Sequence, residues 1–277
     1  LLKAARLKPG MLDVLDGSPP CSSFSSAGKR QANWGKVKEY SGQKQRTDDL
    51  FWEYARLLGE LKPRAFVAEN VAGLTIGSAK GYFNEIISLL RSKGYRVGCR
   101  LLDAAKLGVP QHRERVFFVG FRDDLGVELE WPRPLPRTVT IREALDGLAP
   151  PTEEEVAGAK RKFGQKGEAY LRLIKPGESA SKYNVKGRWF SLSRLRWDRP
   201  SGTVQASHGN TAGCQCIHPD EDRRLVIPEV RRVCSFPEDF STTGDFGERW
   251  ERYGRAVPPL MMRALARTIR ASLESAA

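Results

Sequence analysis

Long apolar runs are missing from this chain of 277 residues. No stretch approaches the ~20 consecutive apolar residues that a helix needs to cross a bilayer. The opening segment LLKAARLKPG also lacks the long apolar core of a secretory signal. These absences predict a soluble, cytoplasmic protein that has no membrane partner. The first residue is Leu rather than Met, so we expect further sequence upstream.

Cysteine is scarce, and the chain has only Cys21, Cys99, Cys214, Cys216 and Cys234. An odd number of thiols scattered through a long chain is typical of a reducing compartment and argues against a disulfide scaffold. We therefore expect free thiols, one of which could act as a nucleophile.

Acidic residues are outnumbered, since 33 Asp and Glu face 46 Lys and Arg and leave a formal net charge of +13. The electrostatic field of such a positive charge attracts polyanions, above all nucleic acid. A basic, solvated surface without a partner would give the same count, so charge alone leaves both interpretations open. The length fits one large domain, or one large and one small domain.

Strands and amphipathic helices alternate in the first half of the chain. The apolar patterns predict buried strands at 11–17, 64–71, 95–104 and 115–122, with helices at 48–63 and 81–95. This order is typical of an α/β fold with a parallel sheet, whose active residues lie on loops at the strand ends. A polar loop rich in glycine and lysine follows the first strand.

The amino-acid composition changes after the last of these strands. Residues 126–200 are rich in proline and charge, and they include the alternating basic and aromatic run KGRWFSLSRLRW. We expect 1–125 to form a main domain, 126–200 a small irregular domain, and 201–277 to return to the main domain. The chain is predicted to end in an amphipathic helix that starts at Pro258–Pro259, because proline is tolerated in a first turn.

Cys21 and Glu69 stand at the ends of the first two predicted strands. Cys21 follows Pro19–Pro20, a rigid turn that would hold the thiol over a cleft in a basic setting that favours the thiolate. Glu69, followed by Asn70, is a carboxylate on a hydrophobic strand, which favours a proton-donating role. For Cys21 the alternative interpretation is a small buried hydrophobic residue. For Glu69 it is an acid that caps a helix.

Gln111, Arg113 and Arg115 form the pattern Q-x-R-x-R at the entrance of the last strand. Alternation along an extended segment places the three side chains on one face. Two guanidinium groups on one face could grip a phosphate or a base carbonyl.

Five segments follow one another in a characteristic order: GSPPCSSFSSAGKR, VAENVAGL, LGVPQHRERVFFVGFR, PEVRRVCSFPEDF and YGRAVPP. Together they resemble the DNA (cytosine-5)-methyltransferases. The resemblance implies an α/β fold with a Rossmann-like, S-adenosylmethionine-dependent methyltransferase sheet. In it, 1–125 and 201–277 would be the catalytic domain, and 126–200 the small irregular target-recognition domain.

The resemblance also implies a role for each candidate residue. Cys21 matches the Pro-Cys nucleophile that adds to C6 of cytosine, and Glu69 matches the carboxyl group that hydrogen-bonds N3 and the exocyclic amine. Arg113 resembles the arginine that holds the cytosine O2, with Arg115 and Gln111 in supporting and phosphate-contacting roles. The thiolate is needed because C5 of cytosine is a poor nucleophile until C6 is attacked.

Double-stranded DNA is the partner that the resemblance implies. The target cytosine must leave the base stack, and the loop that carries Ser25, Lys29 and Arg30 would close over it. Thr203, in RPSGTVQA, would contact the DNA backbone near the target. Basic and aromatic residues of 186–197 suit phosphate contacts, although Trp197 could equally be core.

S-adenosyl-L-methionine is the implied cofactor, with Pro20, Leu50, Arg255 and Val257 as its remaining contacts. The family's Phe-x-Gly-x-Gly loop, and the acidic residue that holds the ribose, have no counterpart in this sequence. Arg255 replaces the family's Asn, where a cation would weaken sulfonium binding or pair with the cofactor's carboxylate. Either the chain is a fragment or another polypeptide supplies the missing part.

A superficial metal motif, C-x-C-x-H, is formed by Cys214, Cys216 and His218. It lacks a fourth ligand at the usual zinc spacing, so we expect no metal there. Cys99 and Cys234 are interpreted as core residues.

The predicted activity is methylation of cytosine C5 in DNA by a monomeric prokaryotic or phage modification enzyme. A cognate restriction endonuclease or a complementary subunit is a candidate partner. Two alternatives stay open: a catalytically silent DNA-binding remnant or subunit, which the missing cofactor loop favours, and an RNA cytosine-5 methyltransferase of the same fold.

Overall fold

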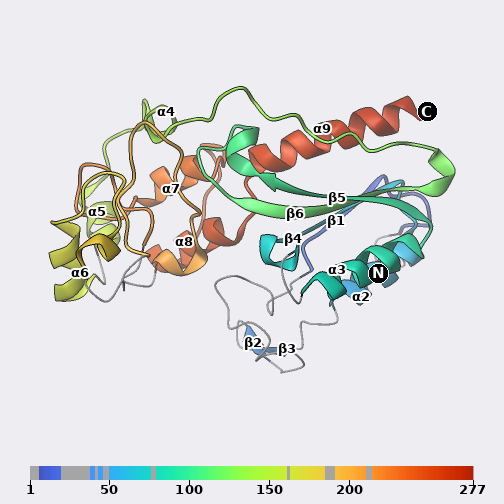
Figure 1. The fold of residues 1–277 in the computed structure, drawn as a ribbon, viewed down its shortest axis with the longest axis horizontal. Coiled ribbons are helices and arrows are strands. Elements are labelled where there is room, and N and C mark those ends of the chain that lie inside the picture. Colours follow the sequence, from blue (N-terminus) through green and yellow to red (C-terminus); the bar gives the residue numbers. More distant parts are fainter. Residues whose placement is uncertain are drawn as a thin grey trace. The chain divides into compact units, whose positions relative to one another are not determined.

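The computed structural model describes residues 6–19, 38–40, 43–45, 50–75, 79–160, 163–184, 191–209 and 214–276. The chain divides into two compact units (Figure 1). Unit 1 comprises Leu1–Leu102, Glu114–Pro132 and Leu265–Ala277, and unit 2 comprises Asp103–Arg113 and Arg133–Ala264. Within the described ranges, no helix has both the length and the apolar character that a bilayer crossing requires.

Unit 1 is built on a four-stranded sheet with the order β1-β4-β6-β5. The strands are β1 (Val14–Gly17), β4 (Ala65–Val71), β5 (Tyr95–Asp103) and β6 (Glu114–Arg122). They confirm the four strands that the apolar runs predict. Two further short strands, β2 (Lys38–Tyr40) and β3 (Gln43–Gln45), pair with each other in the segment expected to be a loop.

The sheet is mixed, so the predicted purely parallel arrangement is wrong. β1 and β4 are parallel, whereas β4 and β6 are antiparallel. The chain passes from β1 to β4 through the helix α2 (Leu50–Leu61), and such a crossover permits parallel pairing. β5 and β6 are adjacent, but residues 104–113 between them hold only the short 3-10 helix Ala104–Leu107, which is too short for a crossover.

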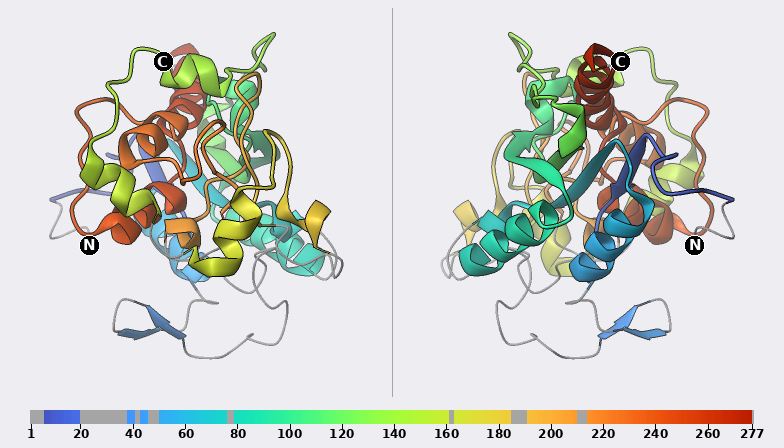
Figure 2. Two further views of the ribbon diagram at one scale, coloured as in Figure 1. Left: turned by 90° about the vertical axis from the view of Figure 1, so that its left-hand side faces the viewer. Right: turned by 90° about the vertical axis from the view of Figure 1, so that its right-hand side faces the viewer.

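Helices cover both faces of this sheet. α2 and α3 (Ala79–Arg91) lie side by side on one face, and the later part of α9 (Pro259–Ser275) lies on the other (Figure 2). Apolar residues at helical spacing bury one side of α2, namely Phe51, Tyr54, Ala55, Leu58 and Leu61. α9 begins at Pro259, which confirms the helix predicted at Pro258–Pro259.

Tyr54 joins α2 to the two parallel strands. Its hydroxyl donates to Leu15 O at 3.0 Å and to Val67 O at 2.9 Å. Burial raises the pKa of this hydroxyl well above its usual value, so it remains a donor. Gly17 makes room for the ring, because a Cβ at that position would lie 2.7 Å from Tyr54 Cε2. The end of β1, just before Pro19, is therefore fixed against α2.

Replacing Gly17 by Ala should lower the free energy of unfolding by about 1–3 kcal/mol, because the added methyl group overpacks the Tyr54 ring. Gly59→Ala within α2 is the matched control, since its Cβ would meet only Lys93 Cδ at 3.5 Å and alanine favours a helix. Urea denaturation followed by circular dichroism measures both variants. Equal stabilities would contradict the close approach of β1 and Tyr54.

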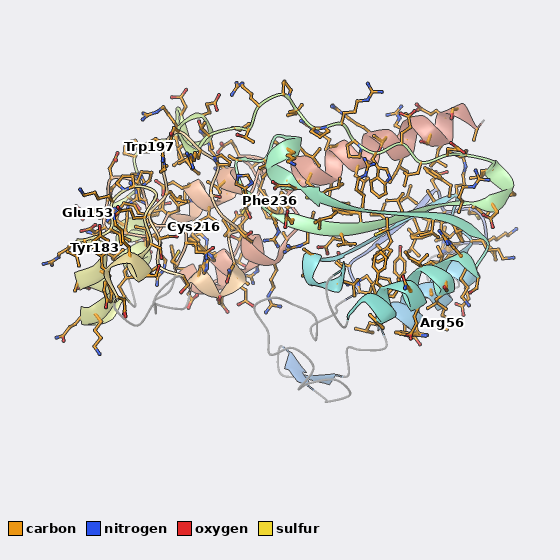
Figure 3. The ribbon with its side chains drawn as sticks, in the orientation of Figure 1. Arg56, Glu153, Tyr183, Trp197, Cys216 and Phe236 are labelled. Atoms are coloured by element: carbon orange, nitrogen blue, oxygen red, sulfur yellow. The ribbon has the colours of Figure 1, made fainter. Side chains whose placement is uncertain are left out.

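Unit 2 consists of helices and loops around an apolar core, and its described residues form isolated β-bridges rather than a sheet. The helices are α4 (Ile141–Leu145), α5 (Glu153–Lys160), α6 (Gly164–Leu171), α7 (Ile227–Val233) and α8 (Phe246–Arg255). Cys216 is fully buried in this core, and the partly buried side chains of Trp197 and Phe236 pack against the core (Figure 3). Trp197 is thus a packing residue, which is one of the two interpretations that the sequence left open.

The core of unit 2 spans the domain boundary expected at residue 200. Ile141 and Leu192 lie in the same buried cluster as Val230 and Trp250. Because these apolar side chains pack together, the compact unit runs on to Ala264. The return to unit 1 therefore comes later than the expected 201.

Candidate active site

The carboxyl ends of β1 and β4 meet because the two strands are parallel neighbours. The buried Asn70 side chain donates from Nδ2 to Pro19 O at 3.0 Å. This bond fixes the chain two residues before Cys21. The roles of five residues stay predictions because they lie outside the described part of the chain: Pro20, Cys21, Ser25, Lys29 and Arg30.

The pairing of β4 with β6 brings Glu69 and Arg115 together. In this register Glu69 lies opposite Phe117 and Val71 opposite Arg115, so Glu69 and Arg115 are diagonal neighbours on one face. Arg115 Nε lies 2.8 Å from Glu69 Oε1, and only 17% and 11% of the two side chains are exposed. Burial lowers the pKa of the Arg115 guanidinium, an effect that the Glu69 carboxylate opposes.

Arg113 is an interior residue of unit 2, with 2% of its surface exposed. Its Nη1 donates to Val204 O at 3.2 Å, and its Nη2 donates to Gly254 O at 2.9 Å and to Arg255 O at 3.3 Å. Position 254 must be glycine, because a Cβ there would lie 2.6 Å from Ala206 N. Arg113 thus holds loop carbonyls together, in place of the expected contact with the cytosine O2.

Gln111 is also an interior residue, and none of its surface is exposed. Its Nε2 donates to Val233 O at 3.4 Å and to Cys234 Sγ at 3.4 Å, while its Oε1 accepts from Val204 N at 3.1 Å. An amide whose two ends have interior partners is poorly placed to reach a phosphate, so Gln111 has a packing role here and its expected DNA contact stays a prediction.

The three residues of Q-x-R-x-R therefore do not share one function. Gln111 and Arg113 bond within unit 2, whereas Arg115 pairs within unit 1. Alternation is a property of one strand, but β6 begins only at Glu114, so Gln111 and Arg113 precede it.

Thr203 lies in a segment that is hydrogen-bonded to the loop before β6. Ser201 N donates to Pro110 O at 2.9 Å, His112 N donates to Ser201 O at 2.8 Å, and Thr203 Oγ1 donates to His112 O at 2.8 Å. The His112 ring is 57% exposed, and its Nδ1 lies 2.9 Å from Asp103 Oδ2. This oriented histidine was not predicted from the sequence, because no local pattern links it to Asp103.

The described cofactor candidates fit only part of an S-adenosylmethionine site. Leu50, at the start of α2 in unit 1, and Val257, in unit 2, are half-buried and offer apolar contacts. Arg255 is exposed and forms an ion pair with Glu251. None of these residues offers a carboxylate to a ribose hydroxyl or a glycine-rich turn, the groups that commonly hold a nucleoside.

Two of the other thiols do not compete with Cys21 as nucleophiles. Burial raises the pKa of the Cys99 thiol to about 12, and it does the same for Cys234. Both stay protonated near neutral pH, and the thiolate is the reactive form. Cys234 is buried in unit 2 and Cys99 packs against the core of unit 1, which confirms their interpretation as core residues.

A comparison with models of known protein families shows to which family this chain belongs. A family model described as C-5 cytosine-specific DNA methylase matches residues 3–271. The chain belongs to this family. Methylases of the family use S-adenosyl-L-methionine as methyl donor.

Curated relatives of this chain are type II methyltransferases. It is 32% identical to M.SacI of Streptomyces achromogenes, over 97% of this chain and 74% of the relative. It is 28% identical to M.Sau96I of Staphylococcus aureus, over 93% of this chain. The chain spans 60% of the length of M.Sau96I.

Solved structures support the fold of the methylase. A DNMT2 variant of Spodoptera frugiperda has a TM-score of 0.63 and 15% identity, and the match covers 93% of this chain and 79% of that chain. The likeness confirms the Rossmann-like α/β fold class that the sequence predicts.

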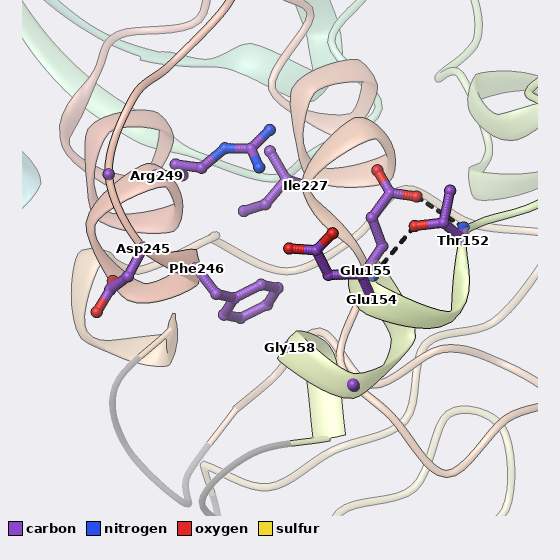
Figure 4. A pocket seen from close by; sticks show the side chains of 10 residues that line it. Thr152, Glu154, Glu155, Gly158, Ile227, Asp245, Phe246 and Arg249 are labelled. Atoms are coloured by element: carbon purple, nitrogen blue, oxygen red, sulfur yellow. Dashed lines mark hydrogen bonds between the residues drawn. The ribbon is translucent and has the colours of Figure 1, made fainter.

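Unit 2 of the methylase also has a pocket of about 500 Å³ beside α5 and α8 (Figure 4). Its lining residues are Thr152, Glu154, Glu155, Ala157, Gly158, Ile227, Gly244, Asp245, Phe246 and Arg249. The predicted site residues are not among them. Sequence patterns do not reveal such a pocket, because its walls come from segments far apart in the chain.

Arg113→Met should lower the free energy of unfolding of the methylase by roughly 3 kcal/mol, because the buried carbonyls of Val204 and Gly254 lose their donors. The control Arg133→Met changes an exposed arginine of the same unit and should stay within about 0.5 kcal/mol of the wild type. Urea denaturation measures the free energy of unfolding of the two variants. A loss no larger for Arg113 than for Arg133 would overturn the interior role.

Proposed function

We propose that this methylase chain activates C5 of a cytosine in double-stranded DNA for methyl transfer. The Glu69–Arg115 pair is the observation that carries the proposal. One edge of cytosine presents the N4 amine, N3 and O2 in a row, that is, a donor and two acceptors. A carboxyl group beside a guanidinium matches this row: Glu69 serves the amine and N3, and Arg115 donates to O2.

The reaction begins with the Cys21 thiolate, which adds to C6 of the flipped base and forms a C–S bond. Electron density moves into the ring toward N3 and O2. The Glu69 carboxylate first takes up a proton from solvent and passes it to N3, and the Arg115 guanidinium stabilises the charge at O2. C5 thereby becomes a nucleophile. S-adenosyl-L-methionine is the methyl source in this family. Later loss of the C5 proton restores the double bond and expels the Cys21 thiolate.

Arg115 takes the O2 contact in this proposal, where the sequence analysis assigned it to Arg113. Arg115 is the arginine that pairs with Glu69, at 2.8 Å. The Nη atoms of Arg113 instead donate to backbone carbonyls inside unit 2. A guanidinium with interior acceptors is a poor source of donors for a base.

DNA binding in the proposal rests on the net charge of +13 and on Thr203. The partly exposed His112, oriented by Asp103, adds a second polar group beside Thr203. Ser25 and Lys29 keep their predicted role in closing over the extruded base. The relatives are named type II methyltransferases, which supports a modification role with a cognate restriction endonuclease as partner. The proposal further takes the enzyme to be a monomer that acts on DNA in the cytoplasm.

The second candidate function is a DNA-binding subunit that lacks catalysis of its own. The partial cofactor site favours it, since Leu50, Arg255 and Val257 offer no carboxylate for a ribose. In this case a complementary polypeptide would supply the nucleoside contacts. An RNA substrate is the third possibility, and competition between duplex DNA and RNA separates it from the first.

Exchange of tritium from [5-³H]cytosine in duplex DNA tests the chemistry of this chain without any methyl donor. Addition of Cys21 at C6 lets C5 take a proton from water, and elimination then releases the tritium. We expect the wild-type chain to release tritium and Cys21→Ala to release none. Glu69→Gln should slow release by about 10²- to 10⁴-fold, the range of general acid catalysis.

The control variant for this assay is Glu60→Gln, an exposed glutamate of α2 whose partner is Arg56, and it should exchange at the wild-type rate. DNA binding without exchange by the wild-type chain would reject the catalytic proposal and favour the silent subunit. Exchange that survives Cys21→Ala would reject Cys21 as the nucleophile.

A further inference from the structure

Two cysteines and a histidine meet inside unit 2, whereas the residues proposed for catalysis belong to unit 1. One ring nitrogen of His208 and the Sγ atoms of Cys214 and Cys216 all lie within 4.8 Å of one another, and all three side chains are buried. The partner histidine is not the one in the C-x-C-x-H pattern. His218 instead stacks edge-on against Trp197, and its Nδ1 accepts from Asp220 N at 3.2 Å.

His208 interacts with the Cys214 side chain, and its Nε2 makes no hydrogen bond of ordinary geometry in the described structure. Its Nδ1 accepts from Gln205 N at 3.4 Å, whereas Nε2 is buried. A buried polar atom without a partner calls for an explanation, and an ion or ligand missing from the coordinates is one. Nε2 is therefore the atom of His208 that is available to a ligand.

Two donors face the Cys214 side chain. Cys216 N donates to Cys214 Sγ at 3.3 Å. The buried Arg224 guanidinium also interacts with the Cys214 side chain. The Cys214 sulfur thus lies among polar groups, and sulfur is a preferred ligand of zinc.

From this geometry we propose that His208, Cys214 and Cys216 bind a Zn²⁺ ion. Thiolate and imidazole are the ligands that zinc prefers, with bonds of about 2.0–2.3 Å. A tetrahedral ion needs ligand atoms roughly 3.5–3.8 Å apart, and the three atoms lie within 4.8 Å of one another, so they have to draw together by about 1.3 Å at most. Binding releases the two thiol protons to solvent and places the imidazole proton on Nδ1, at the expense of the long bond from Gln205.

The backbone already holds these ligands in place. Ser193 N donates to Cys214 O at 3.0 Å, and Leu225 N donates to Cys216 O at 3.1 Å. On the histidine side, Trp250 Nε1 donates to Gln205 O at 3.0 Å. The ion would therefore clamp the 3-10 helix Ala206–Gly209 to the Cys214–Cys216 segment and stabilise this part of unit 2. The proposed site departs from the expectation that the chain holds no metal.

Titration of the full, metal-depleted chain with Co²⁺ tests the proposal, because thiolate-ligated tetrahedral Co²⁺ has intense charge-transfer and visible bands. We expect these bands to saturate at about one Co²⁺ per chain and to disappear when Zn²⁺ is added. His208→Ala, Cys214→Ser and Cys216→Ser should each weaken binding more than about 100-fold, since loss of an outer-shell partner alone costs 10- to 100-fold.

His218→Gln and Cys99→Ser are the matched controls, and both should bind Co²⁺ like the wild type. Far-UV circular dichroism checks that every variant is folded. A folded wild-type chain that shows no thiolate–Co²⁺ bands overturns the site, even where a ligand variant fails to fold. Loss of binding in His218→Gln together with unchanged binding in His208→Ala would overturn it as well.

Discussion

The ion pair between Glu69 and Arg115 depends on the pairing of β4 with β6, and the proposed chemistry depends on the pair. Two mostly buried charges carry a desolvation cost that only close mutual contact offsets, and the antiparallel register supplies this contact at 2.8 Å. Asn70, the residue after Glu69, binds the carbonyl of Pro19. One strand end therefore holds the acid and also fixes the chain that leads to Cys21.

Arginine has different tasks in the two units. In unit 1, Arg115 faces a carboxylate at the end of the sheet. In unit 2, Arg113 donates to the carbonyls of Val204 and Gly254, where loops rather than strands make up the fold. Backbone carbonyls in loops lack the partners that a sheet provides, and a planar guanidinium with five donors can satisfy several at once. Part of the positive charge of the chain thus serves folding rather than DNA.

Local patterns predicted the strands and helices of unit 1 well, because the spacing of apolar residues follows the face that each strand or helix buries. They failed on strand direction, because the alternation of strands and helices indicated a parallel sheet, whereas residues 104–113 are too few for a helical crossover and β6 pairs antiparallel with β4. The candidates Glu69 and Arg115 were found from residue type and position. The interior roles of Gln111 and Arg113 depend on Val204, Val233 and Gly254, which lie far along the chain, and the grouping of His208 with Cys214 and Cys216 likewise depends on tertiary structure.

A double-mutant cycle on Glu69 and Arg115, measured as tritium release from [5-³H]cytosine DNA, tests the central claim most directly. If the two side chains act as one unit on the base, the double variant Glu69→Gln/Arg115→Gln should be no slower than the slower single variant. If the two single effects multiply in the double variant, the residues act independently and the account of a shared, paired site is contradicted.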